Sequence, residues 1–164
     1  MKYDPKIHHR RSIRLQGYDY SQPGAYFITS VAHNTEYLFG EVHDGKMHLS
    51  AAGKIVQRVW LDLPQHYPNV CPDSFCIMPD HIHAIIQIQP VEGGGKAPPL
   101  YEIVRALKTF SAKRVNVLRK MTGQPVWQRN YYEHIIRDAC EWENIQAYIT
   151  ENPLRWEEEA DFPY

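Results

Sequence analysis

The alternation of apolar and polar residues is clearest between His81 and Gln89. Isoleucine or alanine occupies every second position there, and the positions between carry mostly histidine and glutamine, with Ile85 as the exception. Side chains on a strand point to opposite faces with a period of two. The segment is therefore predicted to be a strand with one wholly apolar face. A second strand is predicted over residues 74–78, joined to the first by Met78-Pro79-Asp80.

The remaining elements follow from similar patterns. Runs of β-branched and aromatic residues bounded by turn residues predict strands over 25–33 and 126–136 and a hairpin over 40–49. Apolar residues at helical spacing predict helices over 50–63, 100–120 and 141–151, the first and last of them ending at Pro64 and Pro153. This order predicts an α+β fold with an antiparallel sheet of four to five strands and helices on one face.

The length of 164 residues predicts one domain, and the charge is distributed unevenly around a net value of −1. Residues 1–20 carry a net charge of +3, residues 96–120 carry +6 and residues 133–164 carry −7. We therefore expect a basic N-terminal arm over residues 1–24, a single domain over 25–153 and an acidic C-terminal tail over 154–164. Basic segments with this much charge attract polyanions over about 10 Å, although an ordinary solvated surface has the same pattern.

The location of the protein is predicted from what the composition excludes. No run of 18 apolar residues is present, so no membrane span is expected. Three cysteines form an odd and sparse set, which is typical of reduced thiols rather than a disulfide framework. We therefore expect a cytoplasmic protein that does not bind membranes.

His81 and His83 are the sharpest candidates for chemistry. They share the polar face of the predicted strand, about 6–7 Å apart, so both imidazoles can converge on one cation. A pair of surface histidines has the same sequence pattern. A histidine-triad site is disfavoured because the next position on that face is Ile85, and a zinc site is disfavoured because the spacing of Cys71 and Cys76 does not match a zinc knuckle.

Tyr148 and Asn152 form a second candidate group. They are four residues apart on the last predicted helix and therefore share one face. Trp142, Ile145 and Ile149 form a neighbouring apolar stripe that is expected to dock this helix on the sheet. Taken alone, the pattern is more typical of a half-buried aromatic residue and a polar helix end than of a catalytic pair.

Together with their flanking residues, these motifs resemble the single-tyrosine HUH transposases, and within that group the REP-associated tyrosine transposases. The resemblance covers residues 10–155 and rests on Met78-Pro79-Asp80-His81-Ile82-His83, on Val126-Trp127-Gln128-Arg129 and on Tyr148-x-x-x-Asn152-Pro153. It implies an HUH fold related to ferredoxin and RNA-recognition domains. It also implies a DNA transposase that nicks and rejoins single-stranded hairpin DNA through a 5′-phosphotyrosine intermediate.

The resemblance also implies roles for individual residues. His81 and His83 correspond to the histidine pair that binds a divalent metal, and Tyr148 corresponds to the nucleophile. Asn152 corresponds to the third metal ligand, where related transposases more often have glutamine. Two imidazoles and an amide oxygen suit Mg²⁺ or Mn²⁺. Tyr131 and Tyr132 are rival nucleophiles, but Tyr148 is preferred because it shares a helix face with a candidate ligand.

Partners are expected to be single-stranded DNA with hairpins, such as REP or other palindromic elements. Candidate DNA-binding residues are the basic side chains of the arm, of the outer face of the 100–120 helix and of the segment after Trp127, namely Arg10, Arg11, Arg14, Arg105, Lys108, Lys113 and Arg129. Monomer and homodimer stay open. Two other functions also stay open at this stage, a non-catalytic nucleic-acid-binding module and a metal-dependent nuclease that uses water.

Overall fold

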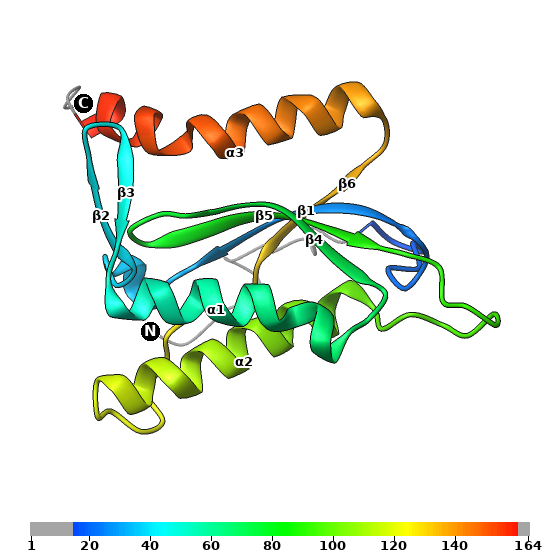
Figure 1. Ribbon diagram of the computed structural model, residues 1–164, viewed down its shortest axis with the longest axis horizontal. Helices are drawn as coiled ribbons and strands as arrows, with labels where there is room; N and C mark the ends of the chain where they lie inside the picture. Colours follow the sequence, from blue (N-terminus) through cyan, green and yellow to red (C-terminus); the bar gives the residue numbers. More distant parts are fainter. Residues whose placement is uncertain (1–14, 161–164) are drawn as a thin grey trace, which may run out of the picture.

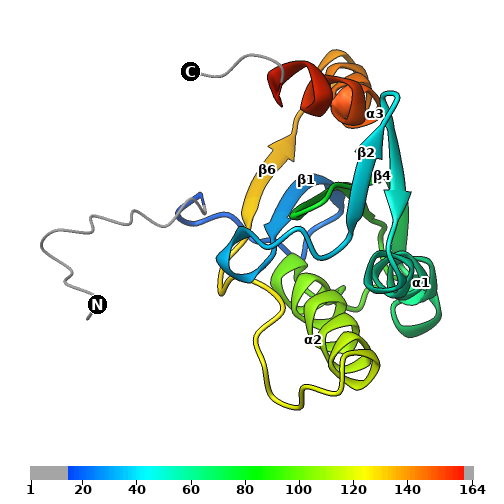
Figure 2. The same ribbon diagram turned by 90° about the vertical axis from the view of Figure 1, so that its left-hand side faces the viewer.

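The computed structural model describes residues 15–160, which form three layers (Figure 1). The middle layer is an antiparallel sheet of four strands, β4 (Val70–Ile77), β5 (His81–Ile88), β1 (Gly24–Val31) and β6 (Tyr132–Ile136), in that spatial order. The helices α1 (Ala51–His66) and α2 (Leu100–Leu118) cover one face of the sheet, and α3 (Ala139–Ala160) lies across the other (Figures 1 and 2). The predicted α+β fold with an antiparallel sheet is confirmed, and α3 occupies the face that was expected to be free of helices.

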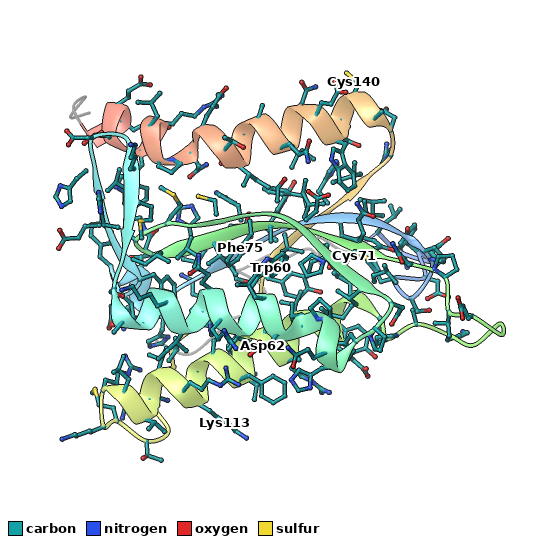
Figure 3. All side chains as sticks on the ribbon, viewed as in Figure 1. Trp60, Asp62, Cys71, Phe75, Lys113 and Cys140 are labelled. Atoms are coloured by element: carbon teal, nitrogen blue, oxygen red, sulfur yellow. The ribbon has the colours of Figure 1, made fainter. Side chains whose placement is uncertain are left out.

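The main core lies between the sheet and the α1–α2 layer. The apolar face predicted for the 81–89 strand points into this core, since Ile82, Ala84 and Ile86 are fully buried there. The rings of Trp60 on α1 and Phe75 on β4 stack at 4.5 Å between the centroids, and Figure 3 shows them between helix and sheet. Burial of about 25 cal/mol per Å² of apolar surface makes this layer the main source of stability.

The remaining hairpin connects the layers at one end of the molecule. Strands β2 (Gly40–His43) and β3 (Lys46–Leu49) pair over residues 40–49 as predicted. Asp44 and Gly45 form the turn with φ of 51° and 66°, the left-handed backbone that a two-residue hairpin turn requires. The hairpin stands beside the sheet and its tip reaches α3 (Figures 1 and 2).

Helix α1 begins as predicted, because the Ser50 hydroxyl accepts a hydrogen bond from the Gly53 amide at 3.1 Å. The expectation that Pro64 ends this helix is wrong, since α1 continues to His66. A proline costs a helix one hydrogen bond, and α1 retains the packing of Trp60 and Leu63 in the core.

The expectation that Pro153 ends the last helix is also wrong, because α3 continues to Ala160. Residues 154–160, assigned above to the acidic tail, are therefore helical. The carboxylate of Glu157 accepts hydrogen bonds from the backbone amides of Asp44 at 3.1 Å and Gly45 at 2.5 Å. These tertiary contacts compensate for the hydrogen bond that Pro153 removes.

Three boundaries differ from the sequence prediction in smaller ways. Strand β4 begins earlier, at Val70, and contains a bulge between Pro72 and Phe75. Only the end of the segment 126–136 is a strand; before it, Trp127 makes an isolated bridge to Ala32. Helix α2 ends at Leu118, and Lys120 follows with a left-handed φ of 55°.

Two features of the described residues concern membranes and cysteines. No helix within residues 15–160 combines the length and the apolarity that crossing a membrane requires. Cys71, Cys76 and Cys140 are free thiols, in agreement with the expectation of reduced cysteines.

Gly53 on α1 provides a test of how closely the hairpin and helix pack. A Cβ added at this position would lie 2.1 Å from the carbonyl oxygen of Phe39, which is backbone. We expect Gly53→Ala to lower the free energy of unfolding by about 2 kcal/mol, although alanine is the better helix former by about 1 kcal/mol. Urea denaturation measures the change. The exposed neighbour Lys54→Ala should change stability by less than about 0.5 kcal/mol, and an unchanged Gly53→Ala protein would contradict the tight packing.

Candidate active site

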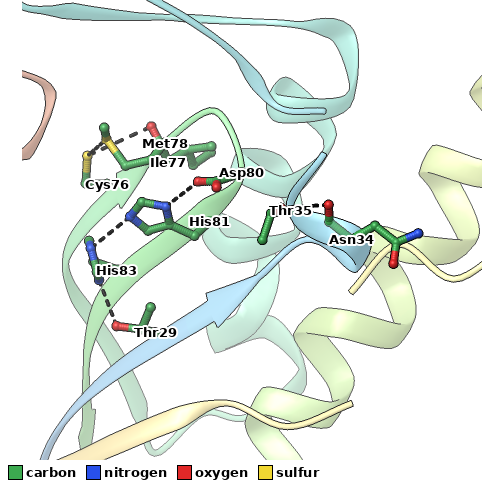
Figure 4. A network of polar contacts seen from close by, with 9 residues as sticks. All are labelled: Thr29, Asn34, Thr35, Cys76, Ile77, Met78, Asp80, His81 and His83. Atoms are coloured by element: carbon green, nitrogen blue, oxygen red, sulfur yellow. Dashed lines mark hydrogen bonds and ion pairs between the residues drawn. The ribbon is translucent and has the colours of Figure 1, made fainter. Parts of the chain in front are cut away.

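The antiparallel pairing of β5 with β1 places two histidines side by side under α3. The Nε2 atoms of His81 and His83 lie 3.0 Å apart. The strand pattern predicts their shared face, and the two rings converge to less than the roughly 6–7 Å spacing of the residues along the strand. The other ring nitrogen of each histidine is held by a neighbour, at 2.6 Å from Asp80 Oδ1 for His81 and at 2.8 Å from Thr29 Oγ1 for His83. Figure 4 shows this chain of contacts, which fixes the orientation of both rings.

The environment of His83 determines its protonation state. The side chain is 5% exposed, and its ring stacks on Phe27 with centroids 5.5 Å apart. Burial, and secondarily the neighbouring His81, lowers the pKa of His83 to about 3. The imidazole is therefore neutral near pH 7, which is the state that binds metals.

One face of α3 lies directly over the histidine pair. The ring of Tyr148 is 5.2 Å from the ring of His83, and the ring of Trp156 is 5.9 Å from the ring of His81. Asn152 lies midway between Tyr148 and Trp156 on the same helix face, because residues four apart are neighbours on a helix. Helical spacing therefore places it on the side of α3 that carries these two rings. Its side chain is 7% exposed and makes no hydrogen bond within residues 15–160.

Several contacts hold α3 in this position. Ile149, which is 2% exposed, packs on Phe27 and Ile85, with Trp142 and Ile145 beside it as the predicted apolar stripe. The first turn is fixed by Glu141, whose carboxylate contacts His134 and accepts a hydrogen bond from the Arg137 amide at 2.7 Å. These contacts pull the pKa of Glu141 below its usual value, chiefly through the Arg137 amide.

A polar contact in the middle of α3 adds to these. Gln146 donates to Asp73 Oδ1 at 3.2 Å, and Gln87 of β5 donates to the other oxygen of Asp73 at 3.3 Å. Asp73 lies in the bulged part of β4. Together with Glu157 at the hairpin, these contacts fix α3 near both ends and in the middle.

Tyr148 is accessible as well as close to the histidines. It is 37% exposed, its ring lies 6.2 Å from that of Phe27, and the guanidinium of Arg155 lies 5.6 Å from its centroid. Arg155 also pairs with Glu151 at 2.9 Å. Tyr148 and the histidine pair come together within one chain in this structure.

The two rival tyrosines lie farther from the histidines. Tyr132 contacts the outer edge of the group, with its ring 6.1 Å from Phe27. The neighbouring Tyr131 lines a groove beside α2 instead. Tyr148, in contrast, has its ring packed on His83 of the pair.

The donor atoms fit a metal that accepts nitrogen and neutral oxygen ligands. His81 and His83 offer their Nε2 atoms and Asn152 offers an amide oxygen. Among residues 15–160, no three His, Cys, Asp or Glu side chains cluster as a metal site. The third donor would therefore be the amide, and Asp80 would orient His81 from behind rather than bind the ion.

Comparison with known proteins agrees with this arrangement. Residues 69–152, which include the histidine pair, Tyr148 and Asn152, match the model of a family described as "Transposase IS200 like". The chain belongs to the IS200-like transposase family. The resemblance expected from the sequence motifs is confirmed, and the family supports a role in DNA transposition.

Relatives of this transposase extend over nearly the whole chain. An uncharacterized protein of Haemophilus influenzae is 40% identical over 172 aligned positions, which cover 96% of each chain. A second protein of that organism, provisionally named a REP-associated tyrosine transposase, is 26% identical over 156 positions, covering 89% of this chain and 81% of the relative.

Two solved structures share the fold. A REP-associated tyrosine transposase bound to a REP hairpin has a TM-score of 0.63 and 17% identity, covering 92% of this chain and 80% of its own. A Deinococcus radiodurans protein, provisionally described as a transposase, has a TM-score of 0.53 and 17% identity, covering 85% of this chain and 98% of its own.

The basic residues predicted to bind DNA gather around one groove of the transposase. The groove has a volume of about 1220 Å³ and lies between α2 and the segment 122–131. Arg105, Lys108, Lys113 and Arg129 all line it, and Lys113 points away from the core in Figure 3. Arg10, Arg11 and Arg14 lie outside the described residues, so their role stays a prediction.

Lys108 differs from the outward-facing lysine expected on this helix. Its ammonium donates to the carbonyl oxygens of Gln128 at 2.6 Å and Asn130 at 3.0 Å. Burial lowers the pKa of Lys108 to about 8. The side chain therefore fastens the segment 128–130 to α2, and DNA contact by Lys108 stays a prediction.

Sequence reasoning missed several residues of the site. Asp80 and Arg155 carried a local signal, since one adjoins His81 and the other lies within two turns of Tyr148. Trp156 continues the spacing of Tyr148 and Asn152 but was hidden by the expected stop at Pro153. Thr29 had no local signal, because only the register Thr29↔His83 brings it to the site.

The low pKa of His83 makes the stability of the transposase depend on pH. The unfolded chain takes up a proton near pH 6.5, whereas folded His83 does so near pH 3. Stability is therefore complete above pH 6.5 and falls as the pH falls from 6.5 towards 3, by at most about 1.4 kcal/mol per pH unit. Denaturation in EDTA at pH 7, 5.5 and 4 measures this slope. His83→Gln should flatten it, and equal slopes for the two proteins would contradict a buried neutral imidazole.

Proposed function

We propose that this transposase cleaves and rejoins single-stranded DNA through Tyr148, with His81, His83 and Asn152 holding a divalent cation. One observation carries the proposal. The ring of Tyr148 packs on His83 and the ring of Trp156 on His81, both from α3. Because Asn152 lies between these two residues at helical spacing, we infer that it is the third ligand beside the two imidazoles.

The ligand set supports Mg²⁺ or Mn²⁺ as the cation. Two imidazoles and one amide oxygen leave coordination positions for a phosphate oxygen and water, and Mn²⁺ accepts imidazole more readily than Mg²⁺ does. When bound, such an ion would neutralise charge on the scissile phosphate. Asp80 and Thr29 keep the imidazoles oriented toward it.

The chemistry expected of Tyr148 is a transesterification. The phenolic oxygen attacks the scissile phosphorus and loses its proton, and the bond from phosphorus to the 3′-oxygen breaks. The 3′-oxygen gains a proton and leaves as a hydroxyl, while the 5′ end stays linked to the tyrosine. Attack by a 3′-hydroxyl on this link reverses the reaction without an external energy source, because the phosphodiester energy is retained. The guanidinium beside Tyr148 favours negative charge on the phenol oxygen and phosphate.

Hairpin DNA is the substrate class that a second surface of the chain supports. Exposed Arg105, Lys113 and Arg129 line the α2 groove, on the sheet face opposite α3, and would provide contacts to phosphates. The related structure with a REP hairpin bound supports the same class of ligand for this chain. The arm residues Arg10, Arg11 and Arg14 extend the basic surface in our proposal.

The nucleophile is tested by tyrosine replacement. Labelled single-stranded DNA with a hairpin is incubated with Mn²⁺ and separated on a denaturing gel. We expect a covalent protein–DNA band for the parent chain and for Tyr131→Phe and Tyr132→Phe, and none for Tyr148→Phe. A band that persists in Tyr148→Phe would remove this assignment. Cleavage without a band would favour a nuclease that uses water, and binding alone would favour a non-catalytic module.

The hairpin contacts are tested by salt dependence. Arg105→Ala combined with Lys113→Ala should weaken binding of a palindromic hairpin oligonucleotide uniformly across sequences. The slope of log affinity against log salt should fall by up to about 2, because each lost phosphate contact releases about one fewer counterion. Fluorescence anisotropy measures both quantities. The matched pair Lys46→Ala and Lys54→Ala, exposed on other elements, should leave them unchanged; an equal loss in that pair would contradict a localised surface.

A further inference from the structure

The segment between β1 and β2 is held tightly against the turn that precedes His81. The amide of Ala32 donates to the Asp80 carbonyl at 2.7 Å, and the amide of Phe39 donates to the Pro79 carbonyl at 3.0 Å. Between these two anchors, Asn34 and Thr35 have left-handed φ values of 55° and 53°. This conformation is uncommon for asparagine and strained for a β-branched residue such as threonine, at a cost of about 1–3 kcal/mol. Figure 4 shows both residues near the Asp80–His81 contact.

The anchored segment presents Tyr37 at the edge of the site. Tyr37 is 71% exposed, the largest exposed fraction of any aromatic residue described. Its ring nevertheless has a partner, since it meets the ring of Trp156 edge-on with centroids 5.6 Å apart. Trp156 in turn lies against His81. The two rings therefore form an aromatic border on the His81 side of the histidine pair, opposite to Tyr148.

The position of Trp156 is fixed from the other side. Leu154 packs over Gly45, and Glu157 is hydrogen-bonded to the hairpin turn. Trp156 therefore lies between His81 and the end of α3 that is bound to the hairpin turn. Tyr37 follows the strained residues Asn34 and Thr35. Burial of apolar surface does not account for Tyr37, because its ring stays exposed although hydrogen bonds at Ala32 and Phe39 hold the segment that carries it.

We propose that Tyr37 and Trp156 form a stacking subsite for one nucleobase of the cleaved strand. This inference rests on the function proposed above and adds a binding site to it. Bases stack on exposed aromatic rings with about 1–3 kcal/mol each, largely independent of sequence. The two rings carry no charge that would bind a phosphate, so the uncharged base is the part of the strand that fits.

The geometry also assigns which nucleotide stacks. In phosphoryl transfer the attacking and leaving oxygens lie roughly in line on opposite sides of phosphorus. Tyr148 lies over His83, and the aromatic border lies beyond His81. The 3′-oxygen therefore leaves toward Tyr37 and Trp156, and the base that stacks is the one immediately 5′ of the cut. Stacking would retain the free 3′-hydroxyl for rejoining.

The binding experiment uses Tyr37→Ala in the full chain, with a short oligothymidylate, no hairpin and EDTA present. We expect its affinity to fall about 10-fold, with an unchanged salt slope, because stacking releases no counterions. Tyr37→Phe should bind as the parent does, and Phe110→Ala, which removes a 39% exposed ring from α2, should also bind as the parent does. Parent-like binding by Tyr37→Ala, or a loss accompanied by a smaller salt slope, would overturn the subsite.

A second measurement tests the assigned nucleotide. Once the cut is mapped from the covalent band, an abasic residue is placed 5′ or 3′ of it. The 5′ abasic residue should slow adduct formation about 10-fold in the parent chain and cause no further loss in Tyr37→Ala. A larger effect of the 3′ abasic residue would overturn the assignment. If no adduct forms but Tyr37→Ala still loses oligothymidylate affinity, the proposed catalytic function fails while the subsite stands.

Discussion

The geometry of the site depends on one small apolar contact, in which Ile149 of α3 packs on Phe27 and Ile85. Those two side chains lie on a sheet face that also carries polar groups, His83 among them. Ile149 directly follows Tyr148, so its burial, with Trp142 and Ile145 packed beside it, sets the rotation of α3 about its axis. A rotation by one residue, about 100°, would turn Tyr148 and Asn152 away from the imidazoles. The apolar packing that holds α3 on this face of the sheet therefore also sets the geometry of the candidate site.

Rotation alone does not fix where α3 lies along its axis, and the hairpin supplies that second constraint. Glu157 binds the amides of Asp44 and Gly45, which point outward only because both residues have left-handed backbone. The contact holds the part of α3 that follows Pro153, where the helix lacks one backbone hydrogen bond. Without it, Trp156 would have no reason to lie against His81. A surface turn far from the histidines therefore determines how the last turns of α3 meet them.

The sequence predicted those parts of the molecule whose signal is local. Period-two alternation correctly placed His81 and His83 on one face, and helical spacing correctly paired Tyr148 with Asn152. The errors have a common cause, since each proline was read for its local cost while tertiary contacts outweighed that cost. The same holds for Lys108, whose helical position predicted exposure although two carbonyl groups of a distant loop capture it. The position of Thr29 depends on the strand register, and the position of Tyr37 depends on a strained loop. Neither can be recognised from a local sequence pattern.

Thr29, the hydrogen-bond partner of His83, explains how the two imidazoles could be arranged both without a cation and with one. The Asp80 carboxylate only accepts a hydrogen bond, so His81 carries its proton on Nδ1 and presents a lone pair at Nε2. Without a cation, His83 can donate from Nε2 to that lone pair while the Thr29 hydroxyl donates to its Nδ1. If His83 held a cation through Nε2, its proton would sit on Nδ1, and the same hydroxyl would accept a hydrogen bond from it. A carboxylate or a carbonyl in place of Thr29 would permit only the second state and would leave two lone pairs opposed at 3.0 Å. A residue that both donates and accepts is therefore compatible with the buried, neutral His83 both without a cation and with one.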